Sequence, residues 1–136
     1  MVITLVKVPD NIKEAFTIQR IIPMATVNSE GVPNVIYVGV WWWEDDETLC
    51  VVNSYLRKTL QNIDDNGWVS FVCHGQNGSF QIKCKAENQK EGPMYVKARK
   101  IASERKRPLP GKSAIICKVL EVYQARGGKG AGDRLI

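Results

Sequence analysis

The sequence predicts a mainly β protein, an antiparallel barrel of about six strands with three short helices set before and between them. Segments rich in β-branched and aromatic residues recur along the 136-residue chain, and short turn sequences join most of them as hairpins. Helical spacing of apolar residues is confined to three segments, too few for the helix after each strand that a doubly wound parallel sheet requires. The length is that of one domain, so residues 1–136 are expected to form a single domain.

The first elements follow from local spacing. Residues 1–19 predict an apolar lead-in and then a helix that begins at Pro9 and has one apolar face. Residues 21–27 predict the first strand, and Gly31 in the turn after it can adopt the positive φ that closes a hairpin. Residues 32–43 are nearly all β-forming and predict one long second strand, which an acidic cluster ends.

Three successive tryptophans, Trp41, Trp42 and Trp43, close this predicted strand. Side chains of a strand alternate between its two faces, so the three indoles cannot share one core. At least one must point outward or be covered by a partner. The pattern leaves open a dimer interface, an aromatic wall near a cofactor, and residues at the end of the barrel.

The second half of the chain continues with strands and helices in alternation. A helix is expected to begin near Arg57 and to continue through Ile63, and Pro93 suits the first position of another, which Pro108 stops. Residues 125–136 are rich in glycine and basic residues, a composition typical of a flexible end. The remaining strands are expected at residues 49–53, 68–74, 79–86 and 113–123.

The junction between the strand at 49–53 and the following helix is a candidate anion site. Asn53 and Ser54 favour a turn, and Arg57, Lys58 and Thr59 fall in the first turns of the helix. An anion there would meet free backbone N–H groups, the positive end of the helix dipole, two cationic side chains and a hydroxyl group. The pattern therefore predicts a phosphate site, and a solvated helix start is the alternative that these residues leave open.

Five segments resemble, in the same order, those of the flavin-binding split barrels, the fold of pyridoxamine 5′-phosphate oxidase and the short FMN-binding proteins. They are Ala25–Asn34, Asp46–Leu49, Arg57–Asn62, Phe80–Lys83 and Lys112–Val119. The resemblance implies a six-stranded antiparallel split β-barrel of the Greek-key type with flanking short helices. It also implies a flavoprotein that holds FMN noncovalently at the interface of a homodimer.

The resemblance implies roles for individual residues, mostly at the flavin edge and the phosphate. The residues it assigns to FMN are Asn34, Val35, Ile36 and Tyr37 along the isoalloxazine edge, Val52, Asn53 and Ser54 beside the ribityl chain, Arg57, Lys58 and Thr59 at the phosphate, and Phe80 and Gln81 on a hairpin strand. Leu135 and Ile136 would cover the flavin of the partner. From the residues alone, Gln81 as an exposed strand residue and Tyr37 as a surface aromatic stay alternatives.

Departures from the family limit the predicted activity. The C-terminal arginine and histidine that close the substrate site of pyridoxamine 5′-phosphate oxidase are not found, and the only histidine, His74, lies in another segment. Oxidation of pyridoxamine phosphate is therefore not expected. The first expectation is an FMN-dependent oxidoreductase or electron-transfer protein whose catalytic residues and redox partner are unknown. The alternative is a split-barrel module that binds deazaflavin F420 or heme without flavin turnover.

Composition argues against several other classes. There is no Gly-x-Ser-x-Gly elbow of a hydrolase, and the four cysteines lie singly in apolar runs, which is typical of buried reduced thiols and not of a metal site. No apolar run is long enough to span a bilayer, so a cytoplasmic location is expected. The formal net charge of +5 is concentrated between Lys97 and Arg107. Such a run is typical of the solvated face of a helix, so nucleic acid is not an expected partner, and polyanion binding through this segment stays an alternative.

Overall fold

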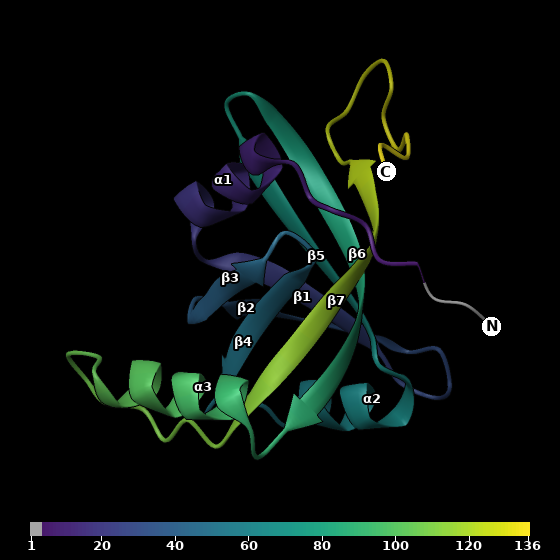
Figure 1. Ribbon diagram of the computed structural model, residues 1–136. Coiled ribbons are helices and arrows are strands. Elements are labelled where there is room, and N and C mark those ends of the chain that lie inside the picture. Colours follow the sequence, from purple (N-terminus) through teal and green to yellow (C-terminus); the bar gives the residue numbers. More distant parts are fainter. Residues whose placement is uncertain (1–3) are drawn as a thin grey trace.

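The computed structural model describes residues 4–136, so the start of the apolar lead-in at Met1 lies outside the described range. Its strands form one antiparallel sheet in the order β2-β1-β5-β6-β7-β4-β3, which curls into a half-barrel (Figure 1). The strands are β1 (Ile22–Val27), β2 (Pro33–Val38), β3 (Trp41–Asp45), β4 (Thr48–Asn53), β5 (Trp68–Gly75), β6 (Gly78–Gln89) and β7 (Ser113–Gln124). The helices are α1 (Asp10–Gln19), α2 (Lys58–Asn66) and α3 (Pro93–Ser103).

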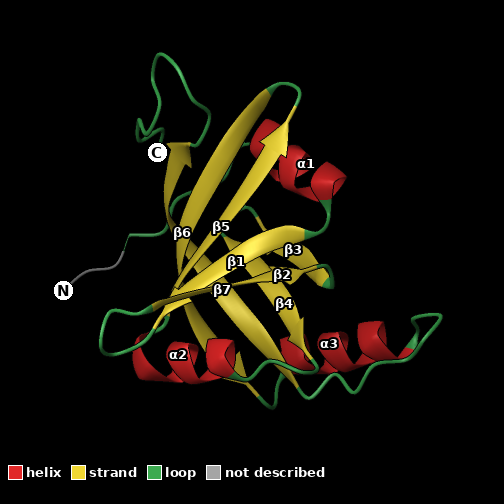
Figure 2. Cartoon of the chain, turned by 180° about the vertical axis from the view of Figure 1, so that it is seen from behind, coloured by secondary structure: helices red, strands yellow, loops and turns green. Residues whose placement is uncertain are grey.

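The helices close the half-barrel at its ends and on one side. Helices α1 and α2 lie at opposite ends of the sheet, and α3 lies beside the lower ends of β4 and β7 (Figures 1 and 2). The first hairpin is formed as predicted, because Gly31 has a φ of 83° and the Asn28 side chain accepts the N–H groups of Glu30 and Val32. None of the helices within residues 4–136 is long and apolar enough to cross a membrane.

The prediction of six strands was wrong, because the segment predicted as one strand over residues 32–43 forms two. Strand β2 pairs with β1, whereas β3 pairs with β4, so the two lie at opposite edges of the sheet. The break at Gly39 and Val40 carries the chain from one edge to the other and thereby curls the sheet.

Arg20 holds this break in place. It directly follows α1 and adopts a positive φ of 68°, and its guanidinium donates to the carbonyl oxygens of Gly39 and Trp41. The same guanidinium lies 4.2 Å from the centroid of the Trp41 ring, and the Trp41 indole N–H donates to the Arg20 carbonyl at 2.6 Å. These contacts tie the end of α1 to the break between β2 and β3.

Two apolar clusters pack on the two faces of the sheet. The main core lies inside the half-barrel and includes Ile12 and Phe16 of α1 and Ile63 of α2. The second cluster lies between α3 and the strands β4 and β7, where Val52 and Ala114 meet Ala98 and Ala102. Helix α3 therefore packs on the sheet through an apolar face that includes Ala98 and Ala102.

The three consecutive tryptophans pack against their own chain. Trp41 and Trp43 face the core and meet edge to face, with ring centroids 6.0 Å apart. Trp42 points to the opposite side and packs in the α3 cluster, where the ammonium of Lys97 lies 5.1 Å from its ring centroid. Alternation along β3 thus places the indoles as expected, and helix α3 takes the covering role for which a partner or a cofactor was considered.

The C-terminal segment folds back along β7, although its composition is typical of a flexible end. Backbone hydrogen bonds join Gln124 N–H to Asp133 O at 2.8 Å and Leu135 N–H to Val122 O at 2.7 Å. From the other end of the chain, Val6 N–H donates to Val119 O at 3.1 Å. The part of β7 that extends beyond β4 is therefore covered by both terminal segments.

Candidate functional site

The start of helix α2 is an unsatisfied donor site. The first backbone hydrogen bond of the helix runs from Gln61 N–H to Arg57 O at 3.0 Å. The N–H groups of Lys58, Thr59 and Leu60 come before it in the chain and have no acceptor within the helix. No side chain caps this end, and its first turn has no acidic residue. The side chains of Arg57 and Lys58 are exposed beside it. These are the donors and charges that a phosphate group requires.

Charges along α2 oppose the helix dipole. The cations Arg57 and Lys58 stand at its positive N-terminal end, and Asp64 and Asp65 stand near its negative C-terminal end. Each placement costs helix stability, typically about 0.3–1 kcal/mol at an exposed site. Helix stability therefore does not explain the two cations, whereas an anion bound between them and the free N–H groups would.

A partly buried hydrogen bond fixes this helix end to strand β2. Asn34 Nδ2 donates to Thr59 Oγ1 at 3.2 Å, and Thr59 is almost fully buried. Strand β2 is an edge of the sheet, so alternate residues present their backbone N–H and C=O groups to the open side. The start of α2 and the open backbone edge of β2 thus form one continuous polar region.

Asn53 and Ser54 shape the loop that leads into this helix. Asn53 Oδ1 accepts from Leu56 N–H at 3.0 Å, while its Nδ2 donates to Ser113 Oγ at 2.8 Å. Ser54 Oγ accepts from Gly111 N–H at 3.1 Å. Both side chains are buried, so in this chain they hold the loop against the start of β7. Tyr55, between them and Arg57, is 70% exposed and was not predicted; its signal is a large aromatic residue inside the predicted turn.

The side chains of the other residues predicted on β2 and β4 point away from this region. Ile36 packs against the main core, and Val52 packs in the cluster under α3. Val35 and Tyr37 point outward from β2 with exposures of 65% and 74%. The structure therefore brings together Asn34, Thr59 and the cations of α2, and separates them from Val52.

Gln81 belongs to the convex surface that we call the outer sheet face. It pairs with Val72 of β5 and with Tyr123 of β7, and the strand register continues across β5 and β1 to β2. Two strands, β5 and β1, lie between β6 and β2, which corresponds to a separation of about 14 Å. The outer sheet face consists of Pro23, Ala25, Val35, Tyr37, Ser70, Val72, Gln81 and Lys83. A shallow groove of about 270 Å³ crosses it between β1 and β5.

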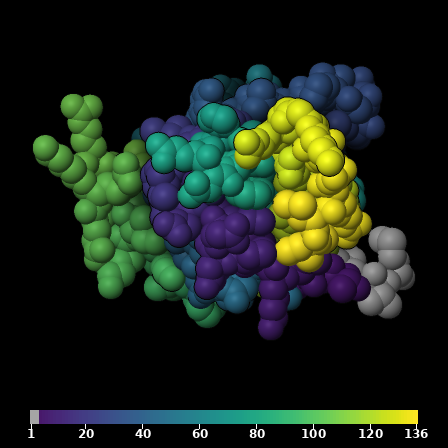
Figure 3. Space-filling model, turned by 90° about the horizontal axis from the view of Figure 1, so that it is seen from above, coloured from purple at the N-terminus to yellow at the C-terminus, as the bar shows by residue number. Residues whose placement is uncertain are grey.

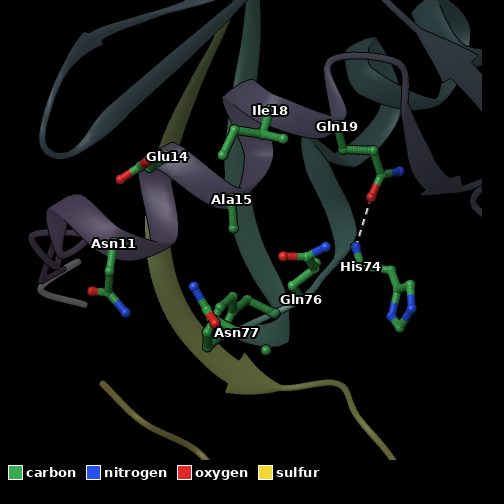
Figure 4. Close-up of a pocket in the computed structure, with 11 residues that line it drawn as sticks. Asn11, Glu14, Ala15, Ile18, Gln19, His74, Gln76 and Asn77 are labelled. Carbon is green, nitrogen blue, oxygen red and sulfur yellow. Dashed lines mark hydrogen bonds between the residues drawn. The ribbon is translucent and has the colours of Figure 1, made fainter.

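A large cavity lies at the opposite end of the sheet from α2. It has a volume of about 820 Å³ and lies between α1 and the β5–β6 hairpin (Figure 4). Phe80 lines it, and Gln19 fixes its wall by accepting the backbone N–H of His74 at 2.6 Å. Its polar lining consists of carboxamides, His74 and Glu14, with no lysine or arginine. It is therefore unsuited to a phosphate, and we place the candidate site at the start of α2.

The four cysteines are buried free thiols, as predicted. Burial raises the pKa of Cys73 to about 11, and burial together with the charge of Glu44 raises the pKa of Cys50 to about 12. Burial also raises the pKa values of Cys84 and Cys117. These thiols are protonated at neutral pH and are poor nucleophiles. Within residues 4–136 no three His, Cys, Asp or Glu side chains converge on a possible metal position.

Comparison with protein families supports the fold and the family resemblance. The model of the family described as pyridoxamine 5′-phosphate oxidase matches residues 8–126. An uncharacterized protein of Methanocaldococcus jannaschii is 30% identical over 116 residues, which cover 83% of this chain and 78% of that protein. The pyridoxine/pyridoxamine 5′-phosphate oxidase of a Ruegeria species is 30% identical over 117 residues. That match covers 78% of this chain and 58% of the oxidase, so the chain spans just over half of this longer relative.

Solved structures with the same fold differ in what they bind. HupZ of Group A Streptococcus has a TM-score of 0.79 and 25% identity, covering 92% of this chain and 99% of its own. An FMN-binding protein of Syntrophomonas wolfei has a TM-score of 0.74 and 16% identity, covering 86% of each chain. The heme storage protein HutZ of Vibrio cholerae has a TM-score of 0.65 and 16% identity, covering 88% and 95%. An F420 reductase has a TM-score of 0.58 and 18% identity, covering 76% and 89%.

Proposed function

Because the chain belongs to the pyridoxamine 5′-phosphate oxidase family, we propose that it is a flavoprotein that binds FMN at the start of α2 and serves as an oxidoreductase or an electron carrier. The observation that carries this proposal is the uncapped helix end, where three backbone N–H groups and two cations have no acidic residue near them in the first turn. A dianionic phosphate would supply the missing cap and neutralise both cations.

The same region suits the rest of FMN. Arg57 and Lys58 would hold the phosphate, and the open backbone edge of β2, from Asn34 to Tyr37, would pair with the pyrimidine end of the flavin. Thr59, bonded to Asn34, keeps the phosphate end and the strand edge in a fixed relation. When bound, FMN would supply the redox chemistry, and the protein would orient it and limit its contact with water.

The position of Gln81 favours a homodimer in which each flavin is shared. A ring along the open edge of β2 is separated from Gln81 of the same chain by two strands, so Gln81 can reach such a ring only from a second copy. The exposed Val35 and Tyr37 on the outer sheet face supply apolar surface for that contact. We therefore propose that the second copy also covers the flavin, with Leu135 and Ile136 as candidates for that cover. Location in the cytoplasm stays a prediction of the sequence.

The visible spectrum of the purified protein, before and after addition of FMN, tests the proposal. Oxidised flavin gives bands at about 370 and 450 nm that disappear on anaerobic reduction. A protein without these bands, and without a change when FMN is added, would refute FMN binding. Titration with F420 and with heme would then test the alternative of a split barrel that carries another cofactor, which the fold shared with HutZ and an F420 reductase suggests.

A further inference from the structure

The positive charge of the chain is confined to one segment. Residues 90–112 contain eight of the 19 lysine and arginine residues and only two of the 14 acidic residues. The remainder of the chain has eleven basic and twelve acidic residues, a net charge of −1. This segment therefore carries the whole excess that gives the protein its formal charge of +5.

The segment stands out from the body of the molecule. Helix α3 and the loop after it extend away from the sheet, and in the space-filling view they project at the left edge (Figures 1 and 3). We call the six exposed cations of α3 and of the loop that directly follows it the basic arm: Lys97, Arg99, Lys100, Arg105, Lys106 and Arg107. The last three follow the end of the helix at Ser103, so the solvated helix face expected from the sequence accounts for only half of the arm.

Most of the arm has no counter-charge among the described residues. Lys97 pairs with Glu44 at 3.3 Å, and Arg99 donates to the Tyr95 hydroxyl at 3.1 Å. The other four cations have no carboxylate within ion-pair distance in residues 4–136. Repulsion from Arg105 adds to burial in lowering the pKa of Arg20, so the field of the arm reaches the body of the protein.

We infer that the basic arm binds the phosphodiester backbone of nucleic acid without regard to base sequence. A row of unpaired, exposed cations on a projecting helix and bend suits a polyanion with closely spaced phosphates. Residues 93–107 contain no asparagine or glutamine to pair with adenine, and half of the cations lie in the loop after α3 and not along a helix face that could enter the major groove. Contacts are therefore expected with phosphates, which carry no base sequence.

The apolar residues of the segment argue against a lipid surface as the ligand. A helix that lies on a membrane presents an apolar face to the lipid. The apolar face of α3 is instead buried, since Ala98 and Ala102 pack against Val52 and Ala114, and Leu109 packs against the same cluster. Val96 is the one exposed large apolar side chain in α3.

Fluorescence anisotropy with a labelled DNA duplex and a labelled single-stranded RNA, in buffer without phosphate, tests this inference. With five cations free of acidic partners, we expect log Kd to change with log salt concentration by a slope of about 4 to 5 on duplex DNA. Affinity should then fall on the order of several hundred-fold between about 50 and 200 mM salt, with little difference between duplexes of different sequence.

Two variants that each lose three positive charges distinguish an effect of the basic arm from an effect of the net charge. Replacing Arg105, Lys106 and Arg107 by alanine should reduce the slope by about 3 and leave FMN binding unchanged. The control replaces Lys7, Arg126 and Lys129, which are exposed elsewhere, and should leave the slope nearly unchanged. Thermal unfolding checks that each variant folds, and glutamine replacements serve if the alanine variant does not.

Three results would overturn the inference. The first is wild-type protein that binds neither nucleic acid at about 50 mM salt, where electrostatic binding is strong. The second is an equal loss in the control variant, which would assign the effect to net charge. The third is binding to vesicles that contain phosphatidylserine without binding to either nucleic acid, which would assign the arm to a membrane surface.

Discussion

Replacement of Lys58 by alanine separates a functional from a structural role of the α2 helix end. Lys58 is exposed, stands at the positive end of the helix dipole and forms no ion pair with any residue from 4 to 136. Its removal should therefore not destabilise the protein without cofactor. Loss of an unfavourable charge at a helix terminus should stabilise that protein by about 0.3–1 kcal/mol.

The same substitution should weaken binding of FMN. A charge-assisted hydrogen bond to phosphate contributes about 1.5–3 kcal/mol, which corresponds to a rise in Kd of roughly 10- to 150-fold. The two measurements thus move in opposite directions, an effect that a merely structural lysine would not produce. Replacement of Lys58 by glutamate should increase both effects, because it reverses the charge at the helix end.

Quenching of FMN fluorescence gives the affinity, and urea unfolding without cofactor gives the stability. Lys7 replaced by alanine is the matched control, because it removes an exposed lysine that lies outside the candidate site. An unchanged Kd for the Lys58 variant would refute the phosphate role. A loss of apoprotein stability that parallels the loss of affinity would refute the reasoning from the helix dipole.

Three further predictions concern Arg20, the outer sheet face and the thiols. Arg20→Ala should lower the free energy of unfolding by about 2–3 kcal/mol in urea, with little recovery in Arg20→Lys, because two carbonyls lose a charged donor that only the planar guanidinium can share. Val35→Asp places a charge on the exposed outer sheet face and should convert the dimer to a monomer in light scattering. It should also weaken FMN binding without lowering the thermal stability of the monomer. A monomeric wild-type protein would contradict the shared site. Folding raises the pKa values of Cys50 and Cys73 to about 12 and 11, above the unfolded value of about 8.5. The stability that these thiols contribute is therefore fully present below about pH 8.5, and the free energy of unfolding should fall by about 1.4 kcal/mol per thiol for each pH unit above it. Urea midpoints that do not change from pH 8 to 10 would contradict this.

Elements that depend on neighbouring residues could be predicted from the sequence. The helix that begins at Asp10, the hairpin closed by Gly31 and the last strand from Ser113 appear close to their expected bounds, because periodicity and turn chemistry are local properties. The break in the predicted second strand could not be found in this way. The contacts at this break come from Arg20, which lies about twenty residues before the carbonyls that it binds, and only Gly39 inside the run gave a local signal.

The ordered backbone of the C-terminal segment could not be predicted from its composition either. Glycine and basic residues predict a flexible end, yet the backbone of residues 133–136 finds free partners on β7. Those partners are free because β4 pairs only with the first half of that long strand. A segment with little side-chain information can therefore be ordered by an unpaired strand edge, which depends on sheet register and not on its own sequence.

For the candidate site, the sequence predicts which side chains suit a phosphate group, but it does not predict which of them lie close enough in the fold to contact one ligand. Arg57, Lys58 and Thr59 are neighbours in sequence and converge at one helix end, so a local pattern was sufficient. Gln81 depends on the order of strands, which puts two strands between it and the open edge of β2. If both groups contact one flavin, the contact must involve two copies of the chain. A Gln81→Ala variant that lowers FMN affinity only under conditions where the protein is dimeric would establish this, and an equal loss in the monomer would contradict it.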